Sequence, residues 1–355
     1  MDTIHIQNIL KNKAFPDLGS EAKLIETHIS WVILTQNFAY KIKKPMRYSF
    51  LDFSTLAKRK FYCERELELN QRLAENMYLT IVPIRRGKKG IVIEGTDGEV
   101  IDYAVKMKRM DENRQMNVLL ENDTVATEHI RNIAEKLSSF HAFTDNIENP
   151  IKISTMREDF ADILKVKRFI GKNLGQHVAD KIEQSVVFSN DFLKKYTHRI
   201  KERHAHGFTI DGHGDLHSKN IFLLDKSMGY KSIIFDCIEF NDHFRQVDVL
   251  SELAFFCMDL DFYGKEDLEI IFLQNYLVKY PCIFNEADRQ IFQYYKLYRA
   301  NVRVKVNALK AMQTMDEKEL QKRMGLVEDY FLLMKKYLAD LKIANLPTEK
   351  TPIKN

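Results

Sequence analysis

Acidic and amide side chains gather in one run, Asp211-Gly212-His213-Gly214-Asp215-Leu216-His217-Ser218-Lys219-Asn220. Residues 221–224 and 232–235 resemble two short strands joined by a turn, and Asp236 ends the second strand. Phosphoryl transfer needs a carboxylate near the acceptor hydroxyl, and Mg²⁺ prefers carboxylate and other oxygen ligands beside phosphate. Asp215 can act as the base, whereas Asn220 and Asp236 can offer oxygens to a metal. A polar loop with a tight turn is the alternative, but the Asp-x₄-Asn spacing before a strand pair and another Asp favours catalysis.

The motif resembles that of a known family. His213-Gly214-Asp215-Leu216-His217-x-x-Asn220 with Phe235-Asp236 is similar to the catalytic and metal motifs of aminoglycoside phosphotransferases and their protein-kinase-like relatives. The longer string Ile234-Phe235-Asp236-Cys237-Ile238-Glu239-Phe240-Asn241-Asp242, followed by Arg245 and Asp248, resembles a bacterial branch of that superfamily. Longer members of this branch carry an additional C-terminal P-loop ATPase domain, but this sequence contains no Gly-x₄-Gly-Lys-Ser/Thr segment. The resemblance runs from about residue 20 to about residue 310.

The resemblance implies a role for each matched residue. Asp215 is expected to be the catalytic base, Asn220 and Asp236 the Mg²⁺ ligands, and Asp248 a structural residue. His217 stands two residues after the base, where it could touch the transferring phosphate or only pack the loop.

A strand near the N-terminus carries a candidate phosphate-binding lysine. In Phe38-Ala39-Tyr40-Lys41 the side chains of Ala39 and Lys41 share one face, so the alanine leaves room for a base and the lysine can reach phosphates. This resembles the Val-Ala-Ile-Lys strand of kinases. The alternative is a solvated basic edge made by Lys41, Lys43 and Lys44.

A helix is expected over residues 54–75, with Ser54 as its N-cap. Glu66 falls on its apolar stripe with Tyr62, Leu69 and Leu73, where a carboxylate is costly unless paired. Lys41 is the expected partner, as in the kinase Lys–Glu pair. A helix rolled so that Glu66 reaches solvent is the alternative.

The glycine-rich loop of protein kinases is missing, since Gly19 is the only glycine before Gly87. This favours the aminoglycoside phosphotransferase type. By analogy alone, the connector at residues 105–110, with Met107 at its centre, would offer backbone groups to adenine.

The order of elements predicts an α+β, two-lobed, protein-kinase-like fold. Strands are expected at 27–35, 38–43, 80–84, 90–94 and 100–107, and helical patterns dominate after about residue 110, over 124–142, 157–203, 245–260, 266–279, 286–313 and 315–341. We expect a nucleotide-binding lobe of small antiparallel sheet and one helix over residues 1–107, a large helical catalytic and substrate lobe over 108–345, and a frayed tail over 346–355.

Composition narrows the class of protein. The net charge is +4 over 355 residues, and no basic block suggests nucleic acid or a membrane surface as a partner. The four cysteines form no C-x-x-C pair, and neither a signal peptide nor a membrane span is visible, so a reducing cytoplasm is expected.

The acceptor is less well defined by the sequence. Arg299 and Arg303 lie on or beside an apolar helix face and would either bind an anionic substrate or pair with an acid such as Asp248 or Glu252. Four acidic residues near the motif leave two alternatives open: they favour a cationic amino sugar as the substrate, or they are ordinary helix caps and solvated charges. They are Glu239, Asp242, Asp259 and Asp261. The sequence thus predicts an ATP- and Mg²⁺-dependent phosphotransferase acting on a small-molecule hydroxyl. The alternative is a non-catalytic, ATP-binding sensor; the missing glycine-rich loop disfavours a protein kinase.

Overall fold

The structure is a computed structural model that describes residues 1–17, 22–48, 50–88 and 90–344. Residue contacts divide it into two compact units: Met1–Thr144 with Asp211–Gln246, and Asp145–Ile210 with Val247–Asn355. The segment 211–246 thus returns to the first unit, so this division differs from a simple boundary at residue 107. That lobe boundary stays a prediction, and the expected tail at 346–355 lies outside the described residues.

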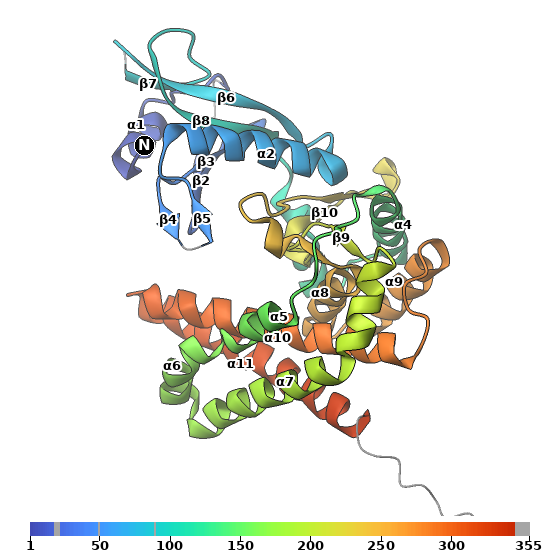
Figure 1. The fold of residues 1–355 in the computed structure, drawn as a ribbon. Helices are drawn as coiled ribbons and strands as arrows, with labels where there is room; N and C mark the ends of the chain where they lie inside the picture. Colours follow the sequence, from blue (N-terminus) through green and yellow to red (C-terminus); the bar gives the residue numbers. More distant parts are fainter. Residues whose placement is uncertain (18–21, 49, 89, 345–355) are drawn as a thin grey trace, which may run out of the picture. The chain divides into compact units, whose positions relative to one another are not determined.

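The first unit is built on a six-stranded antiparallel sheet (Figure 1). In spatial order the strands are β1 (Lys23–Glu26), β2 (Ser30–Leu34), β3 (Phe38–Lys43), β8 (Glu99–Lys108), β6 (Tyr78–Gly87) and β7 (Gly90–Ile93). Helix α2 (Leu56–Ala74) packs on β6 and β8, and α1 (Thr3–Lys11) packs near β7. The short strands β4 (Arg47–Tyr48) and β5 (Leu51–Asp52) pair between β3 and α2.

Strand β3 separates two apolar clusters because successive side chains point to opposite faces. Tyr40 and Ile42 join the cluster that contains α1 residues, whereas Ala39 joins the cluster that contains Met107. Lys41 therefore shares its face with Ala39, the face towards α2.

The remaining elements of the first unit carry the motif. Helices α3 (Met116–Glu121) and α4 (Thr127–Phe143) follow the sheet. The expected strand pair is present as β10 (Ile221–Leu223) and β11 (Ser232–Ile234), which pair antiparallel with Ile221 opposite Ile234. A 3₁₀ turn at Ser218–Asn220 leads into β10, and strands β9 (Thr209–Asp211) and β12 (Gln246–Asp248) lie where the chain passes between the units.

The second unit is helical. Its helices are α5 (Ile153–Ala161), α6 (Leu164–Leu174), α7 (Gln176–Ala205), α8 (Val249–Phe262), α9 (Glu266–Lys279), α10 (Glu286–Gln313) and α11 (Glu317–Ala344). The helical pattern over 157–203 is thus divided among three helices, and Gly175 separates the last two with a φ of 100° that disfavours other residues. Asp248 accepts a bidentate ion pair from buried Arg203, at 2.8 and 2.9 Å.

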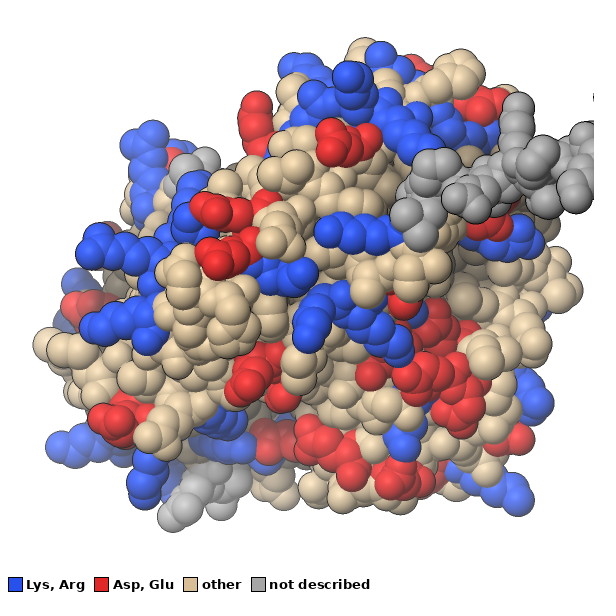
Figure 2. All heavy atoms as spheres, turned by 90° about the horizontal axis from the view of Figure 1, so that it is seen from below, with Lys and Arg blue, Asp and Glu red and all other residues tan. Residues whose placement is uncertain are grey.

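Two further features concern a helix start and the surface. Thr55, not Ser54, caps α2: its side chain accepts a hydrogen bond from the Lys58 amide, whereas Ser54 bonds Asp52. Over the described residues, no helix combines the length and the apolar character needed to cross a bilayer. Basic and acidic side chains both occur across the face in Figure 2.

Candidate functional site

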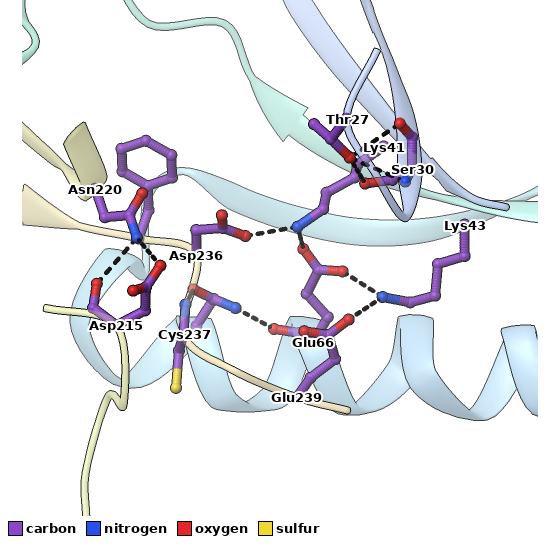
Figure 3. Close-up of polar contacts among 12 residues, drawn as sticks. Thr27, Ser30, Lys41, Lys43, Glu66, Asp215, Asn220, Asp236, Cys237 and Glu239 are labelled. Carbon is purple, nitrogen blue, oxygen red and sulfur yellow. Dashed lines mark hydrogen bonds and ion pairs between the residues drawn. The ribbon is translucent and has the colours of Figure 1, made fainter. Parts of the chain in front are cut away.

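The expected lysine and glutamate meet on the face of the sheet that α2 covers (Figure 3). Lys41 Nζ lies 2.7 Å from Glu66 Oε1 and 2.6 Å from Asp236 Oδ1, and the Glu66 side chain is fully buried. Burial alone lowers the pKa of Lys41, but Asp236 and Glu66 outweigh it and raise that pKa well above its ordinary value. Strand, helix and hairpin therefore each deliver one charged group to the same point.

A second lysine, which the sequence interpretation named only within the alternative of a basic edge, joins this network. Lys43 Nζ lies 2.7 Å from Glu66 Oε2 and also forms an ion pair with Glu239, and only 1% of its side chain is exposed. Burial favours neutral Glu66, yet Lys41 and Lys43 outweigh it and lower the Glu66 pKa to about 2. The signal for Lys43 was present in the sequence, since it shares the face of Lys41.

Asp236 follows β11 in an uncommon backbone conformation. Its φ is 64°, in the left-handed region that aspartate and asparagine enter more readily than most residues. The Asp236 amide donates to Tyr78 Oη at 3.3 Å, and the next amide, of Cys237, donates to Asn70 Oδ1 at 2.9 Å. These bonds turn the carboxylate, 43% exposed, towards Lys41.

The loop before β10 brings the predicted base and amide together. Asn220 Nδ2 donates to the backbone oxygen of Asp215 at 3.0 Å and to its Oδ2 at 3.1 Å. His217 Nε2 lies 3.3 Å from the same Oδ2, and His217 is buried while 38% of the Asp215 side chain is exposed. Gly214, with a φ of 84°, has no room for a side chain, because a Cβ there would lie 2.7 Å from the backbone oxygen of Phe244.

Two arginines anchor the start of this loop. Arg245 donates to both carboxylate oxygens of Asp211, at 2.7 and 2.9 Å, and Arg72 of α2 donates to one of them at 2.8 Å. Arg72 also donates to the backbone oxygen of Gly212 at 2.9 Å. Burial raises the pKa of Asp211, but Arg245 and then Arg72 outweigh it, so the net direction is downward. This anchor was not predicted from the sequence.

A short turn joins β1 to β2. Thr27 Oγ1 accepts a hydrogen bond from the Ser30 amide at 2.9 Å and lies 2.9 Å from Ser30 Oγ. Lys44 donates to the Thr27 oxygen and to Glu26, both at 2.6 Å. Lys44 thus stabilises the turn, whereas Lys41 and Lys43 point into the ion-pair network.

Ala39, expected to leave room for a nucleotide base, and Met107, expected to offer it backbone groups, are neighbours. Ala39 of β3 pairs with Met107 of β8, and both belong to one apolar cluster with Phe222 of β10. Phe235 packs partly buried against this cluster and stacks on Phe222 at 4.9 Å between ring centroids. An apolar layer therefore adjoins the charged network.

Several residues considered for substrate binding also have contacts within the protein. In the second unit Arg299 donates to Ser251 Oγ at 3.3 Å and stacks on Phe255, while Arg303 stacks on Tyr330. Other contacts are Glu239 with Lys43, Asp242 with Arg65 and Arg245, and Asp261 with Lys296 and Tyr337. Of the two acids considered as partners of Arg299 or Arg303, Asp248 binds Arg203, and a pair with Glu252 stays a prediction.

Asp236 and Asn220 carry oxygen donors whose chemistry fits magnesium. Asp236 presents a partly exposed carboxylate, and Asn220 directs its amide nitrogen to Asp215, which leaves the amide oxygen on the other side of the group. Hard oxygen donors of this kind suit Mg²⁺, which keeps water and phosphate among its ligands. Among the described residues, no group of three or more His, Cys, Asp or Glu side chains forms a metal site by itself.

Comparison with solved structures identifies the fold. A choline kinase from Cryptosporidium parvum Iowa II is 15% identical with a TM-score of 0.52, covering 96% of this chain and 98% of that one. A choline/ethanolamine kinase family protein from Mesorhizobium loti is 12% identical with a TM-score of 0.51, covering 97% and 100%. A GDP complex of a variant aminoglycoside 2'-phosphotransferase-IIIa is 12% identical with a TM-score of 0.53, also covering 97% and 100%. The chain has the protein-kinase-like fold. The predicted fold class, α+β with a small sheet and a large helical part, is confirmed.

Sequence relatives are also known. Uncharacterized proteins from Mycobacterium tuberculosis (strain H37Rv) and Mycobacterium bovis are 32% identical to this protein over 301 residues, which covers 81% of this chain. The chain spans about half the length, 55%, of these curated relatives. No protein-family model matches the chain.

Proposed function

We propose that this protein is an ATP- and Mg²⁺-dependent phosphotransferase that moves the γ-phosphoryl group to a hydroxyl of a small molecule. The observation that carries the proposal is the position of Lys41 Nζ, within 2.7 Å of Glu66 and 2.6 Å of Asp236. These groups come from a strand, a helix and a hairpin, and together they match the arrangement that phosphoryl transfer requires. The small-molecule kinases that share the fold support the reaction class.

Each residue has a defined task in this proposal. Bound Mg²⁺ would neutralise charge on the nucleotide phosphates, and Asn220 and Asp236 would hold it. Lys41, fixed by Glu66, would bind a phosphate oxygen. Asp215 would accept the proton of the acceptor hydroxyl, because its carboxylate is the exposed acid of the loop.

His217 and the apolar layer complete the proposed site. His217, buried 3.3 Å from Asp215, would orient the base. Ala39 and Met107 would face the nucleotide base, because they are small or flexible apolar residues beside the lysine. We also propose that the protein is cytoplasmic. Its four cysteines, all in the described part of the chain, are buried thiols outside any disulfide, a state that a reducing compartment would preserve.

The test separates catalysis from nucleotide binding. Asp215→Asn keeps the shape of the side chain and its bonds to the loop but removes the base, so turnover should fall by about 10²–10⁴-fold. The affinity for MgATP, measured by calorimetry, should change little, since no metal ligand is removed. Phosphoryl transfer is measured with a panel of sugars, amino sugars and amino alcohols, and GTP is compared with ATP.

Three outcomes would count against the proposal. Wild-type turnover by Asp215→Asn would show that Asp215 is not the base. Binding of MgATP without transfer to any acceptor would favour the nucleotide-sensing alternative. Absence of MgATP and MgGTP binding to the wild type would reject both functions.

A further inference from the structure

A second buried ion pair lies beside the Lys41–Glu66 pair, and the proposed reaction does not use it. Lys43 and Lys41 stand two residues apart on β3 and each binds a different oxygen of Glu66, at 2.7 Å in both cases. The other partner of Lys43 is Glu239, and both of these side chains are almost fully buried. Glu66 is thus held by two lysines at once (Figure 3).

Lys41 has two partners that nucleotide binding would separate. In the structure its ammonium touches Asp236, the proposed metal ligand, as well as Glu66. If Lys41 turns to a phosphate, its ammonium loses the ion pair with Asp236. Its ion pair with Glu66 then becomes longer, or the ammonium binds Glu66 and the phosphate together. A fully buried carboxylate without a partner is costly, so Glu66 needs a cation that stays in place. Lys43 fills that role, since it is remote from solvent and bound on both sides.

Glu239 ties the same bridge to the metal-bearing segment. It stands three residues after Asp236, and between them Cys237 is bonded to Asn70 of α2 and the Ile238 oxygen accepts from Arg245 at 2.9 Å. Asp236 and Glu239 are therefore held by β3 and Cys237 by α2, while Ile238 is held by Arg245. The pair with Lys43 fixes the far end of this segment.

We propose that Lys43 and Glu239 are positioning residues of the phosphoryl-transfer site. The Glu239–Lys43–Glu66 bridge keeps Glu66 and the segment carrying Asp236 in register on α2, so that Lys41 can leave Asp236 for a phosphate without disturbing either. This inference rests on the proposed function. It assigns a role in the proposed site to Lys43 and Glu239, which would contact neither the nucleotide nor the metal.

The experiment measures how nucleotide affinity depends on magnesium. The probe is ATP, titrated by calorimetry with MgCl₂ present and with EDTA in its place. Glu239→Gln keeps the size of the side chain and leaves Lys43 paired with Glu66. The variant Lys43→Met with Glu239→Gln removes both charges together and serves if the single variant is unstable. It should weaken MgATP binding and also ATP binding in EDTA, because Lys41 would then be the remaining lysine on Glu66. Glu68→Gln, an exposed change on α2, is the matched control.

Loss of a group that supports a metal ligand typically costs about 10–100-fold in metal affinity. Both variants should therefore raise the Kd for MgATP at least about tenfold. For Glu239→Gln the weaker affinity for ATP in EDTA should stay near wild type, and the control variant should match wild type in both titrations. Unchanged MgATP affinity with a lowered melting temperature would show that the pair is only structural and overturn the inference alone. Absence of MgATP binding to the wild type would overturn the proposed function and this inference with it.

Discussion

The carboxylate of Asp236 is placed by its backbone and by one lysine rather than by a cage of ligands. Its φ of 64° is tolerated by asparagine, so Asp236→Asn removes the charge without adding backbone strain. Because loss of a group that only supports a metal ligand costs about 10–100-fold in affinity, loss of the ligand itself should weaken MgATP binding at least as much. Calorimetry with MgATP checks this, with the exposed Asp267→Asn as control. Equal affinities for wild type and Asp236→Asn would place the metal elsewhere.

For individual residues, the sequence predicted the Lys41–Glu66 pair but not the other charged residues around it. Lys41 and Glu66 could be found because each follows the period of its own element, two for the strand and 3.6 for the helix. Lys43 carries the same signal as Lys41, so periodicity cannot say which of the two meets Glu66; the structure shows that both do. Glu239 could not be assigned at all, because its partner lies 196 residues away in the chain.

The loop that carries Asp215 depends on contacts from other elements. Asp211 at its start binds Arg72 of α2 and Arg245, whose side chain is almost fully buried. Asp211→Asn would take the carboxylate from Arg72 and one of the two carboxylates from Arg245, which keeps Asp242. The cost should therefore reach up to about 3 kcal/mol, the lower end of the range for breaking a buried pair. Urea denaturation should show this loss in the free energy of unfolding, whereas Asp225→Asn, in the exposed turn after β10, should show almost none. A loss as small as that of the control would mean that the carbonyl contacts of the arginines and the Arg245–Asp242 pair suffice.

Element boundaries were predicted well where the local pattern is strong. The strand at 38–43, the helix at 54–75 and the β10–β11 pair follow from regular alternation and turn residues, and all are present. The sequence predicted one continuous helical pattern over 157–203, whereas the structure has three helices there. A single glycine, Gly175, does not by itself indicate a break in a helix. Helix α1 and strand β1 were missed, since both are short and β1 is mostly exposed.

The order of elements along the whole chain predicts a helix-rich, two-lobed architecture. It does not predict to which unit the segment that carries the motif belongs. Residues 211–246 belong to the same unit as the sheet through contacts with residues of α2 and the strands. These partners lie far from residues 211–246 in the sequence. Such long-range pairings leave no periodic trace. The ion pairs within the helical unit, such as Arg203 with Asp248, were hidden for the same reason.

Stability of the whole chain should depend on pH through one buried cluster in the helical unit. Lys296 of α10 binds Asp261 of α8 at 2.7 Å and both oxygens of Glu269 of α9 at 2.8 Å. Burial raises the pKa of Glu269 to about 7, against the attraction of Lys296 and with the help of Asp261. The single ammonium of Lys296 is thus paired with two carboxylates. Because it balances only one negative charge, the folded state favours a proton on Glu269.

The sign of the effect follows from this proton. Since the folded state holds it more tightly than the unfolded chain, stabilisation is greatest below the ordinary glutamate pKa and is lost as pH rises towards 7. Between pH 5 and pH 8 the free energy of unfolding of the wild type should therefore fall by up to about 3 kcal/mol more than that of Glu269→Gln, which cannot ionise. Glu266→Gln, an exposed change on the same helix, should keep the wild-type pH dependence. The measurement is urea denaturation at both pH values; identical pH dependence in wild type and Glu269→Gln would mean that Lys296 keeps Glu269 ionised throughout.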